Sequence, residues 1–280
     1  MTDACERVIS PLYPAYQNPA VTTSPRDVER AIAEMLASKK PLARPVLILN
    51  GYHGWSGLAY SHRDRLATLT SKNRDDFLAV SYAFATDIID ASTRVLNAVQ
   101  ERWADVHGNV PQLDVLGISM GGLVARWCAM SPDARAKLPV VAGQRGGRSG
   151  STPRLQLDIA RLFTFASPHR GAILADKIAP DPAGQAMKTD SKFVAAMNDE
   201  ETVRQTRIGE MICYTQLRDT WVGARNTSPP GVHPCWVDGP PLFAHFTAAR
   251  NPIVFADVAR QLRGEERLLT AASHSEPPRM

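Results

Sequence analysis

The fold of this chain is decided by residues 112–127, Gln-Leu-Asp-Val-Leu-Gly-Ile-Ser-Met-Gly-Gly-Leu-Val-Ala-Arg-Trp. The first five residues are predicted to form a short buried strand, and the apolar residues of the second half recur at helical spacing. Between strand and helix lies a G-x-S-x-G pattern, which runs from Gly117 to Gly121 and is centred on Ser119. Glycine at both positions lets strand and helix meet in a sharp turn that lifts the central serine clear of the sheet.

Ser119 is therefore a candidate nucleophile, and the N–H of Met120 would be free to donate to a developing oxyanion. The pattern by itself is weak, because a glycine-rich turn with an incidental serine is expected in roughly one chain of this length in ten or twenty. The strand directly before it and the amphipathic helix directly after it supply the context that a nucleophile elbow requires. We therefore predict that Ser119 is a nucleophile.

Composition places the chain among globular proteins. Its 280 residues are enough for one large α/β domain or two small ones. A content of 44% hydrophobic and 21% charged residues is typical of a globular protein. The net charge is +4 and the Lys and Arg residues are scattered, which argues against nucleic acid or an anionic membrane as a partner. No run reaches the length of a membrane span, and residues 1–7 do not resemble a signal peptide, so a cytoplasmic location is expected.

Cysteine and histidine spacing gives no sign of a metal site. The four cysteines, Cys5, Cys128, Cys213 and Cys235, form no C-x-x-C pair, and the histidines show neither H-x-H nor H-x-x-x-H spacing. Cys128 and Cys213 lie in apolar elements and are predicted to be buried free thiols. A disulfide between Cys5 and Cys235 stays open as an alternative if the protein is exported. We expect no metal and no cofactor.

Strands and helices alternate along the chain. Strands are predicted at 45–50, 77–82, 112–116, 161–166, 211–217 and 235–238, and helices at 26–38, 87–107, from 120 onward, and at 251–263. This order predicts an α/β fold with a mostly parallel, doubly wound sheet that is covered by helices on both faces.

The same order of strands and helices predicts one domain over residues 1–280, with its core at 45–263. Residues 1–25 form an N-terminal extension without periodicity, and the polar residues 264–280 form a tail. Residues 143–154, rich in Gly, Ser and Arg, are predicted to be a flexible surface loop. Residues 172–208 carry mostly helical patterns between two strands, as a small cap or lid over the sheet edge would.

A serine nucleophile needs a base, because its hydroxyl is protonated at neutral pH. The partners of such an elbow follow it in the order Ser, Asp or Glu, then His, which excludes the three histidines before Ser119. His274 lies in the tail, and His169 follows a strand with no acid-bearing strand before it. His233 and His245 remain. We prefer His245, because it stands between the last strand and the terminal helix, where a loop can reach the elbow.

The orienting carboxylate should leave the strand that precedes the histidine. Asp219 meets this requirement at the end of the strand 211–217. Asp238 is the rival, but it precedes Gly239-Pro240 and suits a turn better.

Several segments resemble one family. They are Asn-Gly-Tyr-His-Gly-Trp-Ser-Gly at 50–57, Gly-Ile-Ser-Met-Gly-Gly-Leu-Val-Ala-Arg at 117–126, Phe-Ala-Ser-Pro-His-Arg-Gly-Ala at 165–172, the lid-like 190–198, and the histidine loop and helix at 245–262. Together they resemble the α/β-hydrolase lipases and esterases, in particular the bacterial triacylglycerol-lipase-like group. The likeness spans about residues 46–262.

The resemblance implies a role for each matching residue. Ser119 would attack an acyl carbonyl, His245 would take its proton, and Asp219 would hold the imidazole tautomer. The N–H groups of Met120 and Tyr52 would form the oxyanion hole.

One departure concerns the oxyanion loop, where relatives commonly carry His-Gly and this chain has Asn50-Gly51. A backbone donor at Tyr52 does not need the imidazole. A shifted register that uses His53-Gly54 would move the donor to Trp55.

The sequence therefore predicts a serine hydrolase of carboxylic esters, with a small-molecule or lipid ester as substrate and an apolar acyl pocket that includes Tyr52, Trp55 and Leu58. An acyltransferase or thioesterase would use the same triad, and a non-catalytic protein could keep the same fold. The oligomeric state stays open.

Overall fold

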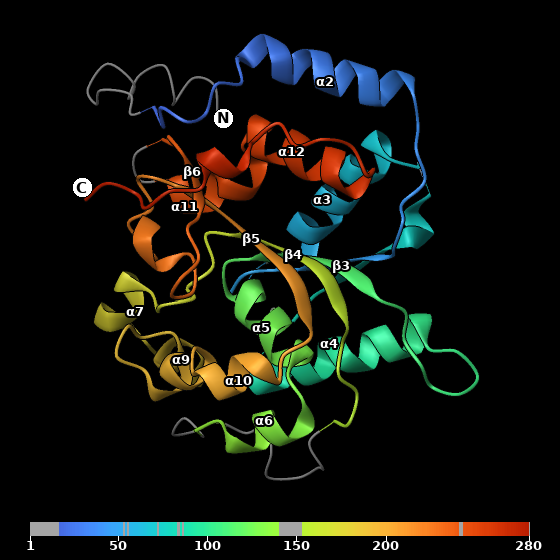
Figure 1. Cartoon of the computed structure of the whole chain (residues 1–280). Coiled ribbons are helices and arrows are strands. Elements are labelled where there is room, and N and C mark those ends of the chain that lie inside the picture. Colours follow the sequence, from blue (N-terminus) through green and yellow to red (C-terminus); the bar gives the residue numbers. More distant parts are fainter. Residues whose placement is uncertain are drawn as a thin grey trace.

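One parallel sheet organises the chain in a computed structural model, which describes residues 17–52, 54, 56–71, 73–82, 85, 87–139, 153–240 and 243–279. Its strands are β1 (Val46–Leu49), β2 (Phe77–Val80), β3 (Leu113–Ile118), β4 (Ile159–Phe165), β5 (Ile208–Gln216) and β6 (Cys235–Val237). They lie in the order β2-β1-β3-β4-β5-β6, and every pair of neighbours is parallel (Figure 1). The predicted α/β fold with a parallel sheet is confirmed.

Helices precede, connect and follow these strands. They are α2 (Pro25–Ala37), α3 (Ser56–Leu69), α4 (Ile88–Trp103), α5 (Met120–Ala129), α6 (Pro132–Lys137), α7 (Ile173–Lys177), α8 (Pro182–Ala186), α9 (Lys192–Met197), α10 (Glu200–Arg204), α11 (Ala244–Thr247) and α12 (Pro252–Leu262). Short 3₁₀ turns lie at η2 (Arg74–Asp76), η3 (Ala224–Asn226), η4 (Ala248–Arg250) and η5 (Ala271–Ser273).

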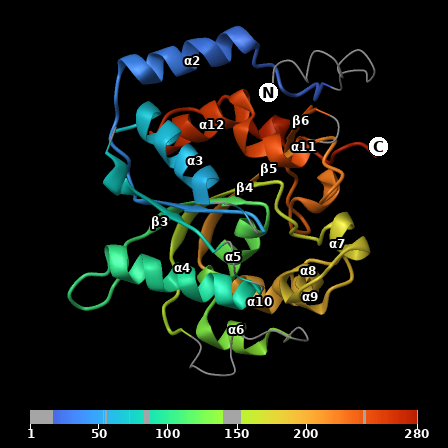
Figure 2. The same cartoon turned by 180° about the vertical axis from the view of Figure 1, so that it is seen from behind.

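The sheet separates two apolar cores, because successive side chains of a strand point to opposite faces. In β1, Leu47 and Leu49 pack in one core with residues of α4 and α5, whereas Val46 and Ile48 pack in the other with residues of α2, α3 and α12. Figures 1 and 2 show α2, α3 and α12 above the sheet and α4, α5 and α6 below it. Both faces are buried, which explains why β1 is apolar at every position.

Capping residues set the helix starts that the sequence indicates. Ser24 and Asp27 form a reciprocal capping box at the start of α2. A second cap lies near the other end of the chain, where the Asn251 side chain accepts a hydrogen bond from the N–H of Ile253 at the start of α12.

The helix predicted at 87–107 is shorter than expected and ends at Trp103. The Asp105 carboxylate accepts hydrogen bonds of 2.8 Å from the N–H groups of both His107 and Asn109, so the chain turns there. Residues 172–208 contain α7 to α10 and add no strand before β5. The loop predicted at 143–154 and the N-terminal extension lie largely outside the described residues.

Candidate active site

The turn between β3 and α5 has the geometry of a nucleophile elbow. Ser119 has φ 51° and ψ −123°, a conformation that costs a residue with a side chain about 1–3 kcal/mol. A Cβ on Gly117 would lie 2.7 Å from the Cα of Gly122, and one on Gly121 would lie 2.6 Å from the carbonyl oxygen of Leu49. Only glycine fits at the two flanking positions of the motif, as the sequence predicted.

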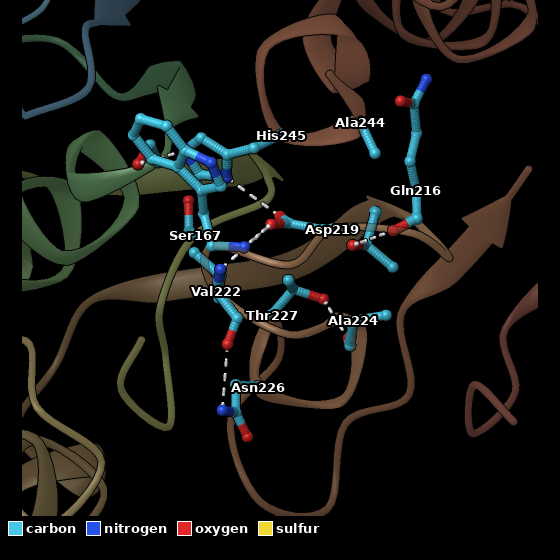
Figure 3. Close-up of polar contacts among 12 residues, drawn as sticks. Ser167, Gln216, Asp219, Val222, Ala224, Asn226, Thr227, Ala244 and His245 are labelled. Atoms are coloured by element: carbon cyan, nitrogen blue, oxygen red, sulfur yellow. Dashed lines mark hydrogen bonds and ion pairs between the residues drawn. The ribbon is translucent and has the colours of Figure 1, made fainter. Parts of the chain in front are cut away.

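Ser119, His245 and Asp219 form a continuous hydrogen-bonded line. The Nε2 atom of His245, in α11, lies 3.0 Å from the Ser119 hydroxyl oxygen, and its Nδ1 atom lies 3.0 Å from Oδ2 of Asp219. Figure 3 shows the Asp219 carboxylate directed at the His245 ring. The Asp219 side chain is wholly buried and that of His245 is 9% exposed, so water competes little for these bonds.

The loop after β5 fixes the orientation of the carboxylate. The other oxygen of Asp219, Oδ1, accepts hydrogen bonds from the backbone N–H groups of Trp221 at 2.9 Å and Val222 at 3.0 Å. The Asn226 side chain donates to the carbonyl oxygen of Val222 at 3.1 Å, which closes the loop on itself (Figure 3). Asp219 is therefore held at both oxygens, one by the backbone and one by the imidazole.

Trp221 contacts His245, which the sequence did not predict. Its ring stacks on the His245 ring at a centroid distance of 5.4 Å and an interplanar angle of 10°, and Phe246 meets it edge-on at 4.5 Å. The only signal in the sequence was an aromatic residue two positions after the candidate acid. The stack restrains the plane of the imidazole between Ser119 and Asp219.

The two candidate oxyanion donors, Met120 and Tyr52, belong to segments that adjoin the candidate nucleophile. Met120 is the first residue of α5, so its N–H has no acceptor within the helix. A Cβ on Gly51 would lie 3.0 Å from the Cβ of Ser119, which places the Gly51 backbone directly against the elbow. The N–H of Gly54 donates to the carbonyl oxygen of Gly51 at 3.0 Å, so Tyr52 lies in a tight turn there.

The Tyr52 side chain reaches the segment that follows β4. Burial, and then a hydrogen bond with Asp181, raises the pKa of Tyr52 above its usual value of 10. Asp181 is the N-terminal cap of α8, where its carboxylate accepts a hydrogen bond of 2.8 Å from the N–H of Gly184. The Tyr52 phenol therefore lies close to the start of α8. Of the other predicted pocket residues, Trp55 lies outside the described residues, as does His53, and only the backbone of Leu58, in α3, is described.

The rejected candidates have other partners. His169 is fully buried with Nε2 3.2 Å from the hydroxyl oxygen of Thr164, and burial, then the charge of Arg126, lowers its pKa well below the usual value. Asp238 forms an ion pair of 3.1 Å with Arg218. His233 borders a separate small cavity beside the C-terminal tail. Within the described segments, no hydrogen bond joins any of these three candidates to Ser119 or His245.

A cavity of about 430 Å³ opens at Ser119 and His245. One wall comes from the region of α7 and α8 and is apolar, with Ala172, Leu174, Ala175, Ile178, Pro180 and Met187. A second wall comes from α3 and the end of η4 and brings His62 and Arg250. This volume is within the range of small-molecule binding sites.

Two solved structures of lipase BlEst2 from Bacillus licheniformis have a similar architecture. The mature form matches with a TM-score of 0.54 and 16% sequence identity over 81% of this chain and 95% of that chain. The propeptide form matches with a TM-score of 0.55 and 15% identity. The match covers 83% of this chain and 53% of the propeptide form. The chain has an α/β-hydrolase fold.

The similarity to these lipases is one of fold. Neither a protein-family model nor a curated protein matches the sequence. The activity must therefore be argued from the site. Cys128, Cys213 and Cys235 are free and buried, as predicted for the first two, while Cys5 lies outside the described residues. The described residues contain no cluster of three His, Cys, Asp or Glu side chains suited to a metal ion, and none of their helices could cross a membrane.

Proposed function

We propose that this protein is a serine hydrolase that cleaves carboxylic esters. The observation that carries the proposal is the hydrogen-bonded line from the Ser119 hydroxyl through both nitrogens of His245 to Asp219. A serine hydroxyl, an imidazole and a buried carboxylate in this arrangement are the parts that acyl transfer requires. The strained backbone at Ser119 supports the same assignment, because strain of this kind is retained where function needs it.

In the first half of the reaction, the Ser119 oxygen attacks the ester carbonyl carbon while Nε2 of His245 accepts the hydroxyl proton. The carbonyl oxygen becomes an oxyanion, which the N–H groups of Met120 and Tyr52 stabilise. The tetrahedral intermediate then collapses, the bond to the alkoxy group breaks, and the leaving alcohol takes the proton from His245. Asp219 keeps Nδ1 protonated and stabilises the positive charge that the imidazole carries between these steps.

In the second half, His245 accepts a proton from water, and the resulting nucleophile attacks the acyl group on Ser119. The carboxylic acid leaves and the proton returns to the serine oxygen, so the enzyme is restored without a cofactor or metal. An alcohol or thiol in place of water would make the same site an acyltransferase. Exclusion of water from the cavity would decide between these acceptors.

The helices α7 to α10 would act as the cap of this site. The part of this segment that lines the cavity, in the region of α7 and α8, is apolar, which suits the acyl chain of the ester. Trp221 and Phe246 are 39% and 50% exposed, so hydrophobic surface extends from the catalytic histidine to solvent. A carboxylic ester with an aliphatic acyl chain is the substrate class that fits these surfaces.

Labelling with a fluorophosphonate probe, on wild type and Ser119→Ala, tests the proposal directly. We expect labelling of wild type that is lost in the variant, followed by turnover of p-nitrophenyl esters whose chain-length profile separates esterase from lipase. His245→Ala should lower kcat/KM by about 10²–10⁴, whereas His169→Ala serves as the matched control and should retain turnover in its folded fraction. Folded wild-type protein that neither labels nor cleaves any ester would refute the proposal and favour a non-catalytic role.

A further inference from the structure

The cavity at Ser119 contains a buried imidazole that the proposed mechanism does not use. His62, from the middle of α3, lines the cavity and is 3% exposed. Its Nε2 atom is buried without a hydrogen-bond partner among the described residues. A buried polar atom in this state normally has a water molecule or a ligand as its partner.

Two guanidinium groups lie near this imidazole. Arg250, at the end of η4, lines the same cavity, and Arg65 lies one helical turn after His62 in α3 with its guanidinium 4.1 Å from the centre of the Phe255 ring. Burial first, and then the charges of Arg65 and Arg250, lowers the pKa of His62 to about 4. The charge of Arg250, after burial, also lowers the pKa of Arg65, so the two guanidinium groups repel each other.

The positive charges of these two arginines are not balanced by a carboxylate of the described residues. In the segments that the structure describes, neither Arg65 nor Arg250 forms an ion pair with Asp or Glu. An anion bound here would relieve the repulsion and would accept hydrogen bonds from Arg250 and from Nε2 of a neutral His62. Guanidinium groups suit phosphate and carboxylate, since their N–H donors match the geometry of paired oxygens.

We propose that His62 and Arg250 bind an anionic phosphate or carboxylate group on the alcohol part of the substrate ester. This inference rests on the proposed function, because it takes Ser119 as the nucleophile for the same bound molecule. The apolar wall from α7 and α8 receives the acyl chain, while the wall from α3 and η4 receives the charged alcohol. The ester lies between them at Ser119, so the enzyme prefers amphiphilic esters with an anionic head.

Matched esters measure this preference. The substrates are the hexanoyl esters of glycerol, glycerol 3-phosphate and glyceric acid, which share an acyl chain and differ in the charge of the alcohol. At fixed ionic strength we expect kcat/KM to be about tenfold or more higher for a charged ester than for the glycerol ester, as charged hydrogen bonds of this kind provide. The phosphate and carboxylate substrates show which oxyanion is preferred.

Variants at Arg250 test the assignment, because this side chain is exposed and its replacement leaves the core intact. The ratio of kcat/KM for charged and neutral esters should fall to near one in Arg250→Ala, remain partly raised in Arg250→Lys and fall below one in Arg250→Glu. His62→Gln should lower the same ratio. Arg94→Ala, in an exposed arginine of α4 outside the cavity, is the matched control and should leave the ratio unchanged.

A binding experiment separates this inference from the proposed function. Calorimetric titration of Ser119→Ala with millimolar glycerol 3-phosphate should show binding that Arg250→Ala abolishes, whereas glycerol should not bind. Arg250-dependent binding without any ester cleavage would refute the hydrolase and keep the anion site. Ester cleavage that depends on Ser119, with equal kcat/KM for charged and neutral esters and no binding of glycerol 3-phosphate, would overturn the anion site and keep the hydrolase.

Discussion

Replacement of Asp219 by asparagine should invert the hydrogen bonding of His245, the proposed base. Oδ1 of Asp219 accepts from the N–H groups of Trp221 and Val222, so an asparagine at this position must place its oxygen there. Its NH₂ group then faces Nδ1 of His245, which lies 3.0 Å from the present Oδ2. A donor at that place requires Nδ1 to be an acceptor, and the imidazole proton moves to Nε2.

An imidazole that is protonated at Nε2 cannot take the proton of the Ser119 hydroxyl, 3.0 Å away. The same tautomer error lowers turnover by about 10⁴ in a serine protease triad. At 1.36 kcal/mol for each factor of ten, this corresponds to about 5 kcal/mol of lost transition-state stabilisation. The fold should survive, because asparagine keeps both backbone hydrogen bonds of the loop.

The assay compares kcat/KM for p-nitrophenyl butyrate with the thermal unfolding midpoint of each variant. Asp219→Asn should lose activity by about 10⁴ with a midpoint near that of wild type, whereas Asp219→Ala should also lose stability, since it leaves two buried N–H groups without an acceptor. Asp238→Asn, which breaks an ion pair with Arg218, is the control and should keep its activity. Turnover of Asp219→Asn within about tenfold of wild type would refute the tautomer argument.

Three further predictions concern residues around the site. Gly121→Ala should lower both kcat and stability, by about 1–3 kcal/mol in the free energy of unfolding, because its Cβ would lie 2.6 Å from the Leu49 carbonyl oxygen and 2.7 Å from that of Asn50; unchanged urea denaturation would contradict this. Arg126→Met should destabilise the fold by about 2–4 kcal/mol, because it removes donors to the Met197 carbonyl oxygen at 2.6 Å and to Oδ1 of Asn198 at 3.0 Å, and Arg94→Met is its exposed counterpart. The pKa of His62 is lowered from 6.5 to about 4, so as pH falls the unfolded chain takes up the proton before the folded protein does. Stability that is present above pH 6.5 is therefore lost as pH falls toward 4, by about 3 kcal/mol from this group. His62→Gln should remove this part of the pH dependence, measured by chemical denaturation between pH 4 and 7.

The sheet could be predicted from sequence because each strand contains an apolar run. β1 is apolar and buried at every position, so hydrophobicity alone marks it. β3 is also buried throughout, but it includes the charged Asp114. The helices α3, α6 and α11 were missed, and His245, expected in a loop, lies in α11. α3 begins at Ser56, two residues after Gly54. Its apolar pattern is broken by His62, Arg63 and Arg65, which serve the cavity or the surface.

The candidate triad could be predicted because its order and its placement at strand ends follow from topology. Ser119 follows β3, Asp219 follows β5, and His245 follows β6. The contribution of Trp221 could not be predicted, since a stacking contact depends on the relative position of two loops. The position of His62 in the cavity could not be predicted either. Chain order alone excluded this residue as the base, because it precedes Ser119.

Arg126 connects the nucleophile helix to the helical segment that follows β4. Its guanidinium is buried, and it donates from α5 to Met197 and Asn198 at the end of α9. Asn198 in turn donates to the carbonyl oxygen of His169 at 2.8 Å. Breaking the short hydrogen bonds of a buried charge is costly, because the charge is then left without partners, so α9 is held firmly to α5.

The contacts of α7 are different in kind, because Ala175 is its one buried residue. Asp176 of α7 accepts hydrogen bonds of 2.8 Å from the N–H and the hydroxyl of Thr189, and these bonds are exposed to water. Exposed polar contacts contribute little to stability, because water replaces them at low cost. The region of α7 and α8 supplies the apolar wall of the cavity. In α8, Ala183 and Ala186 are fully buried, whereas Ile178, directly after α7, is 66% exposed. Adjustment of the cavity to acyl chains of different length is therefore expected at α7, while α8, α9 and the Ser119 turn keep their positions.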